Sequence, residues 1–270
     1  MNFGGTYPAH SLHEATFVVV PVPYDLTSTY QPGSRRGPIA IIEASTNMEL
    51  YDEELKKETY LAGIHTTLPV DVDARGPKNM ISAVRKKISK IVALNKIPVM
   101  LGGEHSISLG AVQALKEKYP RLSVLQLDAH ADLRDSYQGS PYSHASVARR
   151  ISELCPLVQV GIRSMSKEEG DFLPTSNVKS YSADFVGERK DWCEKISKDT
   201  KGDVLSPSIW MFSTLPSWRP PGHRNREVCT GGMCCACLNP FHAPARSAAS
   251  MLWNWPRFPA ISRLISWPPN

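Results

Sequence analysis

Three side chains that can bind a metal ion follow one apolar segment at intervals of two residues. Asp128, His130 and Asp132 come directly after the run Leu122-Ser-Val-Leu-Gln-Leu. That run has the composition of a buried β-strand, and residues two apart share one face while the chain stays extended. Charges this dense beside a buried strand need a compensating cation. Carboxylates combined with an imidazole suit Mn²⁺ better than Ca²⁺, which takes oxygen ligands almost alone.

A fourth candidate ligand, His105, follows a second apolar segment. The stretch Met100-Leu-Gly-Gly-Glu-His-Ser106 places it where a strand turns into a helix. The two glycines allow the backbone to bend tightly there. Taken alone, a histidine at such a turn is more often a structural residue with satisfied hydrogen bonds. In a chain that also contains Asp-Ala-His-Ala-Asp, it is better explained as a further metal ligand.

The segments around these motifs predict an α/β domain. Short runs rich in Val, Ile and Leu suit parallel strands that are covered on both faces. These runs are residues 16–23, 97–103, 122–128 and 157–162. Apolar residues three or four apart predict helices at 83–94, 109–119 and 144–154. Alternating strands and helices imply a three-layer α/β/α sandwich with a mainly parallel sheet, in which ligands collect beyond the carboxyl ends of the strands.

These motifs resemble those of the ureohydrolase family, which contains arginases and agmatinases. The matching segments are Gly102-Gly-Glu-His-Ser106 and Asp128-Ala-His-Ala-Asp132, and residues 21–38 resemble the N-terminal pattern of the family. The likeness covers about residues 15–204, and from Leu133 to Arg150 it is to the agmatinase branch. It implies an arginase-like fold and hydrolysis of agmatine to putrescine and urea. Another guanidino compound, such as guanidinobutyrate, is the alternative substrate.

The resemblance also implies a role for each candidate residue. An intact family member binds two Mn²⁺ per subunit. Asp128 would bridge the two ions, with His105 and Asp132 on one of them and His130 on the other. His144 would stand near the leaving amine as a substrate contact or proton shuttle, and its alternative is a surface histidine at a helix start. An intact member is also expected to be a homo-oligomer.

The distribution of charge argues against a nucleic-acid partner. The net charge of +5 arises beyond Pro207, where six arginines face a single acid, Glu227. No segment approaches the ~20 apolar residues of a membrane span, and the first residues do not resemble a secretory signal. We therefore expect a cytoplasmic protein that acts on a small guanidino molecule and binds neither nucleic acid nor membrane. A binding module that uses the basic tail is a weaker alternative.

Near Pro207 the pattern of strands and helices ends. Ten of the 22 prolines and five of the six tryptophans lie from there to Asn270. We expect an incomplete ureohydrolase domain at residues 1–206 and an unstructured, out-of-frame tail rich in Pro, Trp, Cys and Arg at 207–270. Possible zinc ligands crowd this tail: Cys229, Cys234, Cys235, Cys237 and His242. They lack the paired CxxC spacing of structural zinc sites, so tail composition is the better explanation.

The tail begins where the family has a second acidic motif, Ser-x-Asp-x-Asp-x-x-Asp-Pro, two of whose carboxylates complete the metal site. This chain instead has Ser206-Pro-Ser-Ile-Trp-Met-Phe-Ser-Thr-Leu-Pro216. In a shifted reading frame, each new codon consists of the third base of one codon and the first two bases of the next. Read in this frame, the codons of Trp210-Met-Phe212 encode Asp-Val whatever synonymous codons are used. The same frame also permits Ser-Ile-Asp-Met-Asp-Val-Leu-Asp-Pro-Ala over the whole segment. Arg224 to Val228 likewise permit Glu-Pro-Gly-Gly, which resembles a substrate-side motif of the family.

We infer that the chain leaves its ancestral reading frame near residues 204–206. The C-terminal part of the fold is then lost or non-native, and the metal cage lacks its second pair of carboxylates. The chain is therefore expected to be an impaired enzyme, and a non-catalytic remnant is the alternative.

Overall fold

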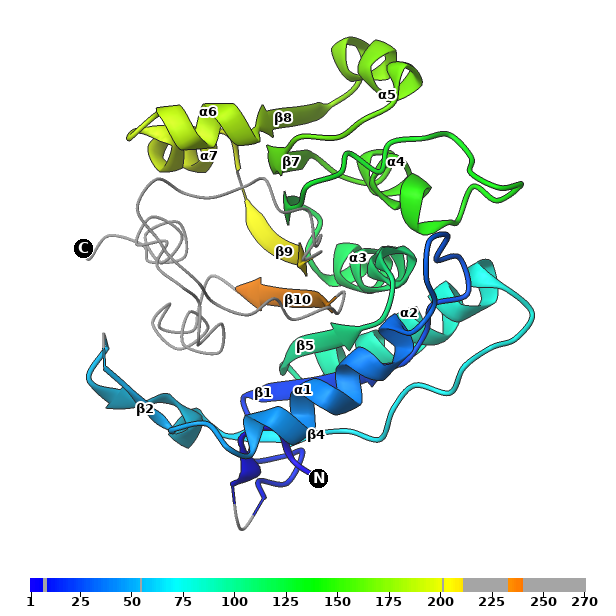
Figure 1. Ribbon diagram of the computed structural model, residues 1–270. Coiled ribbons are helices and arrows are strands. Elements are labelled where there is room, and N and C mark those ends of the chain that lie inside the picture. Colours follow the sequence, from blue (N-terminus) through cyan, green and yellow to red (C-terminus); the bar gives the residue numbers. More distant parts are fainter. Residues whose placement is uncertain (7–8, 54, 201, 211–232, 240–270) are drawn as a thin grey trace.

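The computed structural model describes residues 1–6, 9–53, 55–200, 202–210 and 233–239 of the 270-residue chain. In these residues an eight-stranded sheet has helices on both of its faces (Figure 1). A separate two-stranded hairpin joins β2 (Tyr51–Asp52) to β3 (Lys57–Glu58). The arrangement is the three-layer α/β/α sandwich that the sequence predicts.

The strands of the main sheet lie in the order β4-β1-β5-β10-β9-β6-β7-β8. Their bounds are β1 Phe17–Val22, β4 Ile64–Thr66, β5 Ile97–Gly102, β6 Leu122–Leu127, β7 Leu157–Ile162, β8 Val178–Ser182, β9 Asp203–Trp210 and β10 Met233–Asn239. All neighbouring strands are parallel except at β10, which runs antiparallel to both β5 and β9. The prediction of a mainly parallel sheet is confirmed.

The helices follow the strands in the order expected for an α/β protein. They are α1 Gly37–Ser45, α2 Pro77–Ala93, α3 Ser108–Lys118, α4 Val147–Ser152, α5 Lys167–Phe172, α6 Ala183–Glu188 and α7 Trp192–Asp199. In α2, Val84, Ile88 and Ile91 are buried at intervals of three and four residues. Proline suits the first position of this helix, because the N–H that it lacks would have no partner inside the helix. None of the described helices is long and apolar enough to cross a lipid bilayer.

Side chains of β6 alternate between two hydrophobic clusters. Leu122 and Val124 belong to the larger one, which also includes buried residues of α2, α3 and α4. Leu125 belongs to the smaller one, together with Trp192 and Ile196 of α7. Since neighbouring residues of a strand point to opposite faces, this alternation shows that helices cover β6 on both sides.

One expectation about the tail is wrong for two short stretches. Residues 207–270 were expected to be unstructured, but 207–210 continue β9 and Met233–Asn239 forms β10. β10 fills the place between β5 and β9, where each strand would otherwise expose a row of unpaired backbone groups (Figure 1). Backbone pairing of this kind depends little on side-chain identity, so a segment of unrelated sequence can supply it. The remainder of the tail lies outside the described residues.

The backbone of Gly103 packs directly against the loop after β1. A Cβ atom at this position would overlap the carbonyl oxygen of Tyr24. The neighbouring amide of Glu104 donates a hydrogen bond to that same oxygen at 2.8 Å. The absence of a side chain at Gly103 therefore lets the loops after β1 and β5 meet.

We expect Gly103→Ala to lower the free energy of unfolding by about 3 kcal/mol, because the added methyl meets rigid backbone. Urea unfolding followed by circular dichroism would measure the loss. The matched control is Gly187→Ala, an exposed position in α6 where an added Cβ meets nothing within 4 Å. The control should keep or slightly raise the midpoint, since alanine favours helix. Equal midpoints for the two variants would refute the close approach.

Candidate metal centre

The candidate ligands gather at the carboxyl ends of two strands of the sheet. His105 begins a short 3-10 turn, His105–Ile107, that connects β5 to α3. Asp128 comes directly after the last residue of β6, and Asp132 lies four residues farther on. Because β5 and β6 run in the same direction within the sheet, their carboxyl ends lie at the same edge. This is the place where α/β sheets bind ligands.

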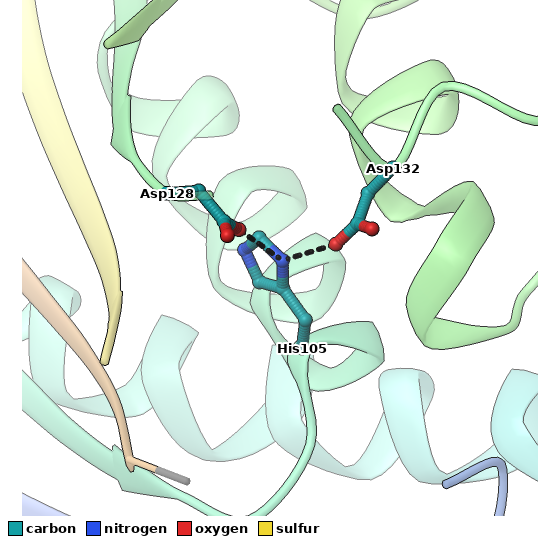
Figure 2. A group of neighbouring side chains, drawn as sticks. All are labelled: His105, Asp128 and Asp132. Atoms are coloured by element: carbon teal, nitrogen blue, oxygen red, sulfur yellow. Dashed lines mark hydrogen bonds and ion pairs between the residues drawn. The ribbon is translucent and has the colours of Figure 1, made fainter. Parts of the chain in front are cut away.

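His105 lies between the two aspartates, as Figure 2 shows. Its Nδ1 atom is 2.9 Å from Oδ2 of Asp132 and 3.5 Å from Oδ2 of Asp128. One ligand atom from each of the three side chains falls within 4.8 Å of the others. The cluster is therefore compact enough to surround one small cation.

Buried amides support the Asp128 carboxylate. Oδ2 accepts a hydrogen bond from Gln126 Nε2 at 3.0 Å, and Oδ1 accepts one from the backbone amide of His130 at 2.9 Å. Gln159 in turn donates to Gln126 Oε1 at 2.9 Å. Burial alone would raise the pKa of Asp128, but the interactions with His130, His105 and Gln126 together hold it below its ordinary value. Asp128 is thus kept as an oriented anion.

Asp132 has a different environment. Its side chain is 12% exposed, and burial together with the charge of Asp128 raises the pKa of its carboxyl despite the opposing hydrogen bond from His105. The negative charges of Asp128 and Asp132, on either side of one imidazole, repel each other, and this repulsion raises the pKa of Asp132. Asp132 also has a φ of 52°, a left-handed conformation that aspartate tolerates better than most residues. Its carbonyl accepts a hydrogen bond from the amide of Ala148, at the start of α4.

His130 lies on the other side of Asp128. Its Nδ1 is 3.6 Å from Oδ1 of Asp128, whereas His105 lies nearest Oδ2, and the His130 side chain is 37% exposed. The Asp128 carboxylate raises the pKa of His130, whereas partial burial opposes this shift. The Asp128 carboxylate therefore has one imidazole beside each of its oxygens.

His144 lies near enough to Asp132 for its charge to act on that carboxyl, and its hydrogen bonds are to Thr27 in the loop after β1. It begins the 3-10 turn His144–Ser146, and its backbone amide donates to Thr27 Oγ1 at 3.0 Å. Its Nδ1 is 3.2 Å from the same oxygen. Its ring lies at 87° to the ring of Tyr137, with 5.8 Å between centroids.

The structure thus brings His105, Asp128 and Asp132 into one cluster, with His130 beside it and His144 held by a neighbouring loop. Sequence reasoning missed four supporting residues: Thr27, Glu104, Gln126 and Gln159. Of these, Gln126 could have been predicted from the sequence, because it lies two residues before Asp128 and so on the same face of the strand. Of the cysteine and histidine cluster in the tail, Cys229 and His242 lie outside the described residues, as do the side chains of Cys234, Cys235 and Cys237.

The donor atoms fit a divalent cation. Ligands at roughly 2.1 Å from an octahedral ion lie about 3 Å apart when adjacent. The separations of 2.9 and 3.5 Å around His105 Nδ1 match that spacing. For a second ion, the side chains that the structure describes here offer Asp128 and His130. The sequence has no acid between Asp203 and Glu227, so β9 beyond its first residue supplies no carboxylate.

Comparison with known proteins gives a consistent family likeness. The sequence model of the Arginase family matches residues 15–206. The chain is 36% identical over 217 residues to the N(1)-aminopropylagmatine ureohydrolase of Synechocystis sp., covering 78% of this chain and 71% of that protein. It is 34% identical over 194 residues to the agmatinase of Bacillus cereus, covering 69% of this chain and 66% of that protein.

A solved structure shares the fold. The agmatine ureohydrolase of Thermoplasma volcanium superimposes with a TM-score of 0.68 and 31% identity, covering 77% of this chain and 70% of that chain. The chain spans from 53% to 71% of the length of the curated relatives it resembles. The match with the family ends at residue 206, within β9.

Proposed function

Because the chain belongs to the arginase family, we propose that its metal centre serves the hydrolysis of agmatine to urea and putrescine with Mn²⁺ as the metal. The observation that carries this proposal is the cluster of His105, Asp128 and Asp132, whose donor atoms lie within 4.8 Å of one another. His130, on the far side of Asp128, is the proposed ligand of a second ion. Imidazole with carboxylate is a donor set that suits Mn²⁺.

The proposed reaction adds water to the guanidinium carbon of the substrate. The bond from this carbon to the alkyl nitrogen breaks, and a proton passes to that nitrogen, so that urea and an amine leave. When bound, Mn²⁺ would supply the Lewis acidity that lowers the pKa of water towards neutrality. Asp128, together with His105 and Asp132, would hold the metal, and His144 is proposed to contact the departing amine.

We further propose that this chain is impaired, because it lacks the second pair of carboxylates. The pairing of β9 with β6 supports this view. Ser208 lies opposite Leu127, the residue just before Asp128. In the alternative frame the codons of Ser208 and Ile209 can read as an aspartate, which would fall beside the end of β6. A non-catalytic remnant is the competing proposal.

The names of the relatives favour a second candidate substrate. Several of them are called N(1)-aminopropylagmatine ureohydrolase, and others are called agmatinase. Both substrates carry an amine at the end distal to the guanidinium, whereas guanidinobutyrate carries a carboxylate there. These relatives therefore support a cationic substrate for this chain's lineage.

We expect a frame-restored protein to prefer either cationic substrate over guanidinobutyrate by at least about tenfold in kcat/KM, the effect of one well-formed polar contact. Urea release from each compound at equal concentration measures the preference. The ratio of aminopropylagmatine to agmatine turnover then decides between the two candidates. A preference for guanidinobutyrate would overturn the proposed substrate class while leaving the hydrolysis of a guanidino compound in place.

A further inference from the structure

A buried carboxylate that the proposed metal centre does not use lies next to one of its ligands. Glu104 precedes His105 and is 5% exposed. Its side chain points to the loop after β1, where Oε2 accepts the backbone amide of Thr27 at 2.6 Å and Oε1 accepts the Thr27 hydroxyl at 2.6 Å. The hydroxyl of Ser106 also donates to Oε1. Glu104 therefore acts as an acceptor for donors on both sides.

The Thr27 hydroxyl connects this carboxylate to His144. A threonine hydroxyl has one hydrogen to donate and two lone pairs that accept. Its hydrogen goes to Glu104, so its remaining interactions must be as an acceptor. One lone pair receives the backbone amide of His144 at 3.0 Å. The other faces His144 Nδ1 at 3.2 Å, and that nitrogen can fill it only by donating a hydrogen.

We propose that Thr27 and Glu104 are positioning residues that hold His144 in the tautomer with the proton on Nδ1. The Nε2 atom of the neutral ring is then an unprotonated acceptor. The meaning of this arrangement for catalysis rests on the proposed function, in which His144 contacts the departing amine. The hydrogen-bond geometry itself does not depend on that proposal.

This arrangement suits a group that takes up a proton and passes it on. Nε2 can accept a proton from the site and later donate it to the alkyl nitrogen as the carbon–nitrogen bond breaks. Both the neutral ring and the imidazolium carry a hydrogen on Nδ1, so the contact with Thr27 is the same in both states. The ring therefore needs no rotation between accepting and donating. With the opposite tautomer, Nε2 would already hold a hydrogen and could not accept another.

The tautomer can be measured directly on the full chain. We would label histidine with ¹⁵N, record the ring nitrogens without added metal at about pH 8.5, above the ordinary histidine pKa, and assign His144 by the loss of its signals in His144→Asn. We expect the chain itself to show a protonated Nδ1 and a bare Nε2 at His144. Thr27→Ser keeps the hydroxyl and should preserve this pattern. Thr27→Val removes the acceptor and should move the proton to Nε2 in most molecules.

Glu104→Gln provides an independent test with little change of shape. To avoid facing the amide of Thr27, the new NH₂ group must point towards the Thr27 hydroxyl and donate to it. The hydroxyl hydrogen is then released to His144 Nδ1, and the tautomer should invert although Thr27 is intact. A bare Nδ1 in the unmodified chain, or the same tautomer in the chain, Thr27→Val and Glu104→Gln, would overturn the proposal. Neither metal nor turnover enters this measurement, so its outcome is separate from that of the proposed function.

Discussion

Correcting the reading frame just before Ser206 should raise the rate of urea release from agmatine by at least about 10³-fold over the chain described here. A bound metal ion stabilises the charge of a transition state by several kcal/mol, and about 4 kcal/mol corresponds to this factor. The chain has four candidate ligands, His105, Asp128, His130 and Asp132, but no acid between Asp203 and Glu227. An incomplete cage should therefore leave the enzyme nearly inactive, not mildly slowed, because only interactions formed in the transition state raise turnover.

The pairing of β9 with β6 explains why a corrected reading frame should restore ligands to the metal centre. β9 pairs in parallel with β6, and Ser208 lies opposite Leu127. A carboxylate introduced at the codons of Ser208 and Ile209 would come to the edge of the sheet where Asp128 lies. A corrected C-terminal part would also replace the antiparallel β10 between β5 and β9.

A colorimetric urea assay with Mn²⁺ and agmatine measures the difference. The control is Asp128→Asn in the frame-restored protein, which keeps the side-chain shape and should return the rate to the level of the present chain. This control separates restored chemistry from improved folding alone. If the present chain and the corrected protein release urea at similar rates, the tail supplies a working site, and the inferred change of reading frame does not explain a loss of activity.

The present chain should hold at most one Mn²⁺, and hold it weakly. His105, Asp128 and Asp132 can surround one ion, since their donor atoms lie within 4.8 Å of one another. A second ion would have only His130 and the remaining oxygen of Asp128 among the described side chains. Two protein ligands are too few for an ion that takes about six. Metal analysis after gel filtration should give a ratio between zero and one per chain, and two in the frame-restored protein.

Substitutions distinguish specific from adventitious metal. Asp128→Asn should abolish the bound Mn²⁺, because this carboxylate lies beside both histidines. Asp135→Asn is the matched control, since Asp135 is nearby in sequence, exposed, and paired with Arg150 and not with the cluster. Two tightly held ions in the present chain, or metal content unaffected by Asp128→Asn, would contradict the proposed centre.

The local periodicities of the sequence were sufficient to predict the layers of the fold. Short apolar strands and amphipathic helices are specified by neighbouring residues, so the parallel sheet and helices α2, α3 and α4 could be predicted without structure. The sequence predicted Asp128, His130 and Asp132 on one face of an extended chain. In the structure the strand ends at Leu127 and Asp132 has a φ of 52°, so the compact cluster consists of the two aspartates and His105 instead. Their meeting with His105 required only that two parallel strands end at the same edge.

Other features depend on contacts between residues far apart in the chain. Nothing in the local sequence connects Thr27 to His144 or Gln159 to Gln126, which the fold brings together across 117 and 33 residues. The opposite shifts in the pKa values of Asp128 and Asp132 likewise arise from their surroundings, because the two side chains are chemically identical.

The tail shows the same division. Its composition alone distinguished residues after Pro207 from the domain before them, because residue types are a property of the linear chain. Only the tertiary structure decided that part of the tail pairs as β10, because there β5 and β9 offer unpaired backbone groups. Residues 233–238 form a short apolar run like those that predicted other strands, but their antiparallel place between β5 and β9 follows only from the tertiary structure. The candidate metal ligands, by contrast, could be identified from the sequence.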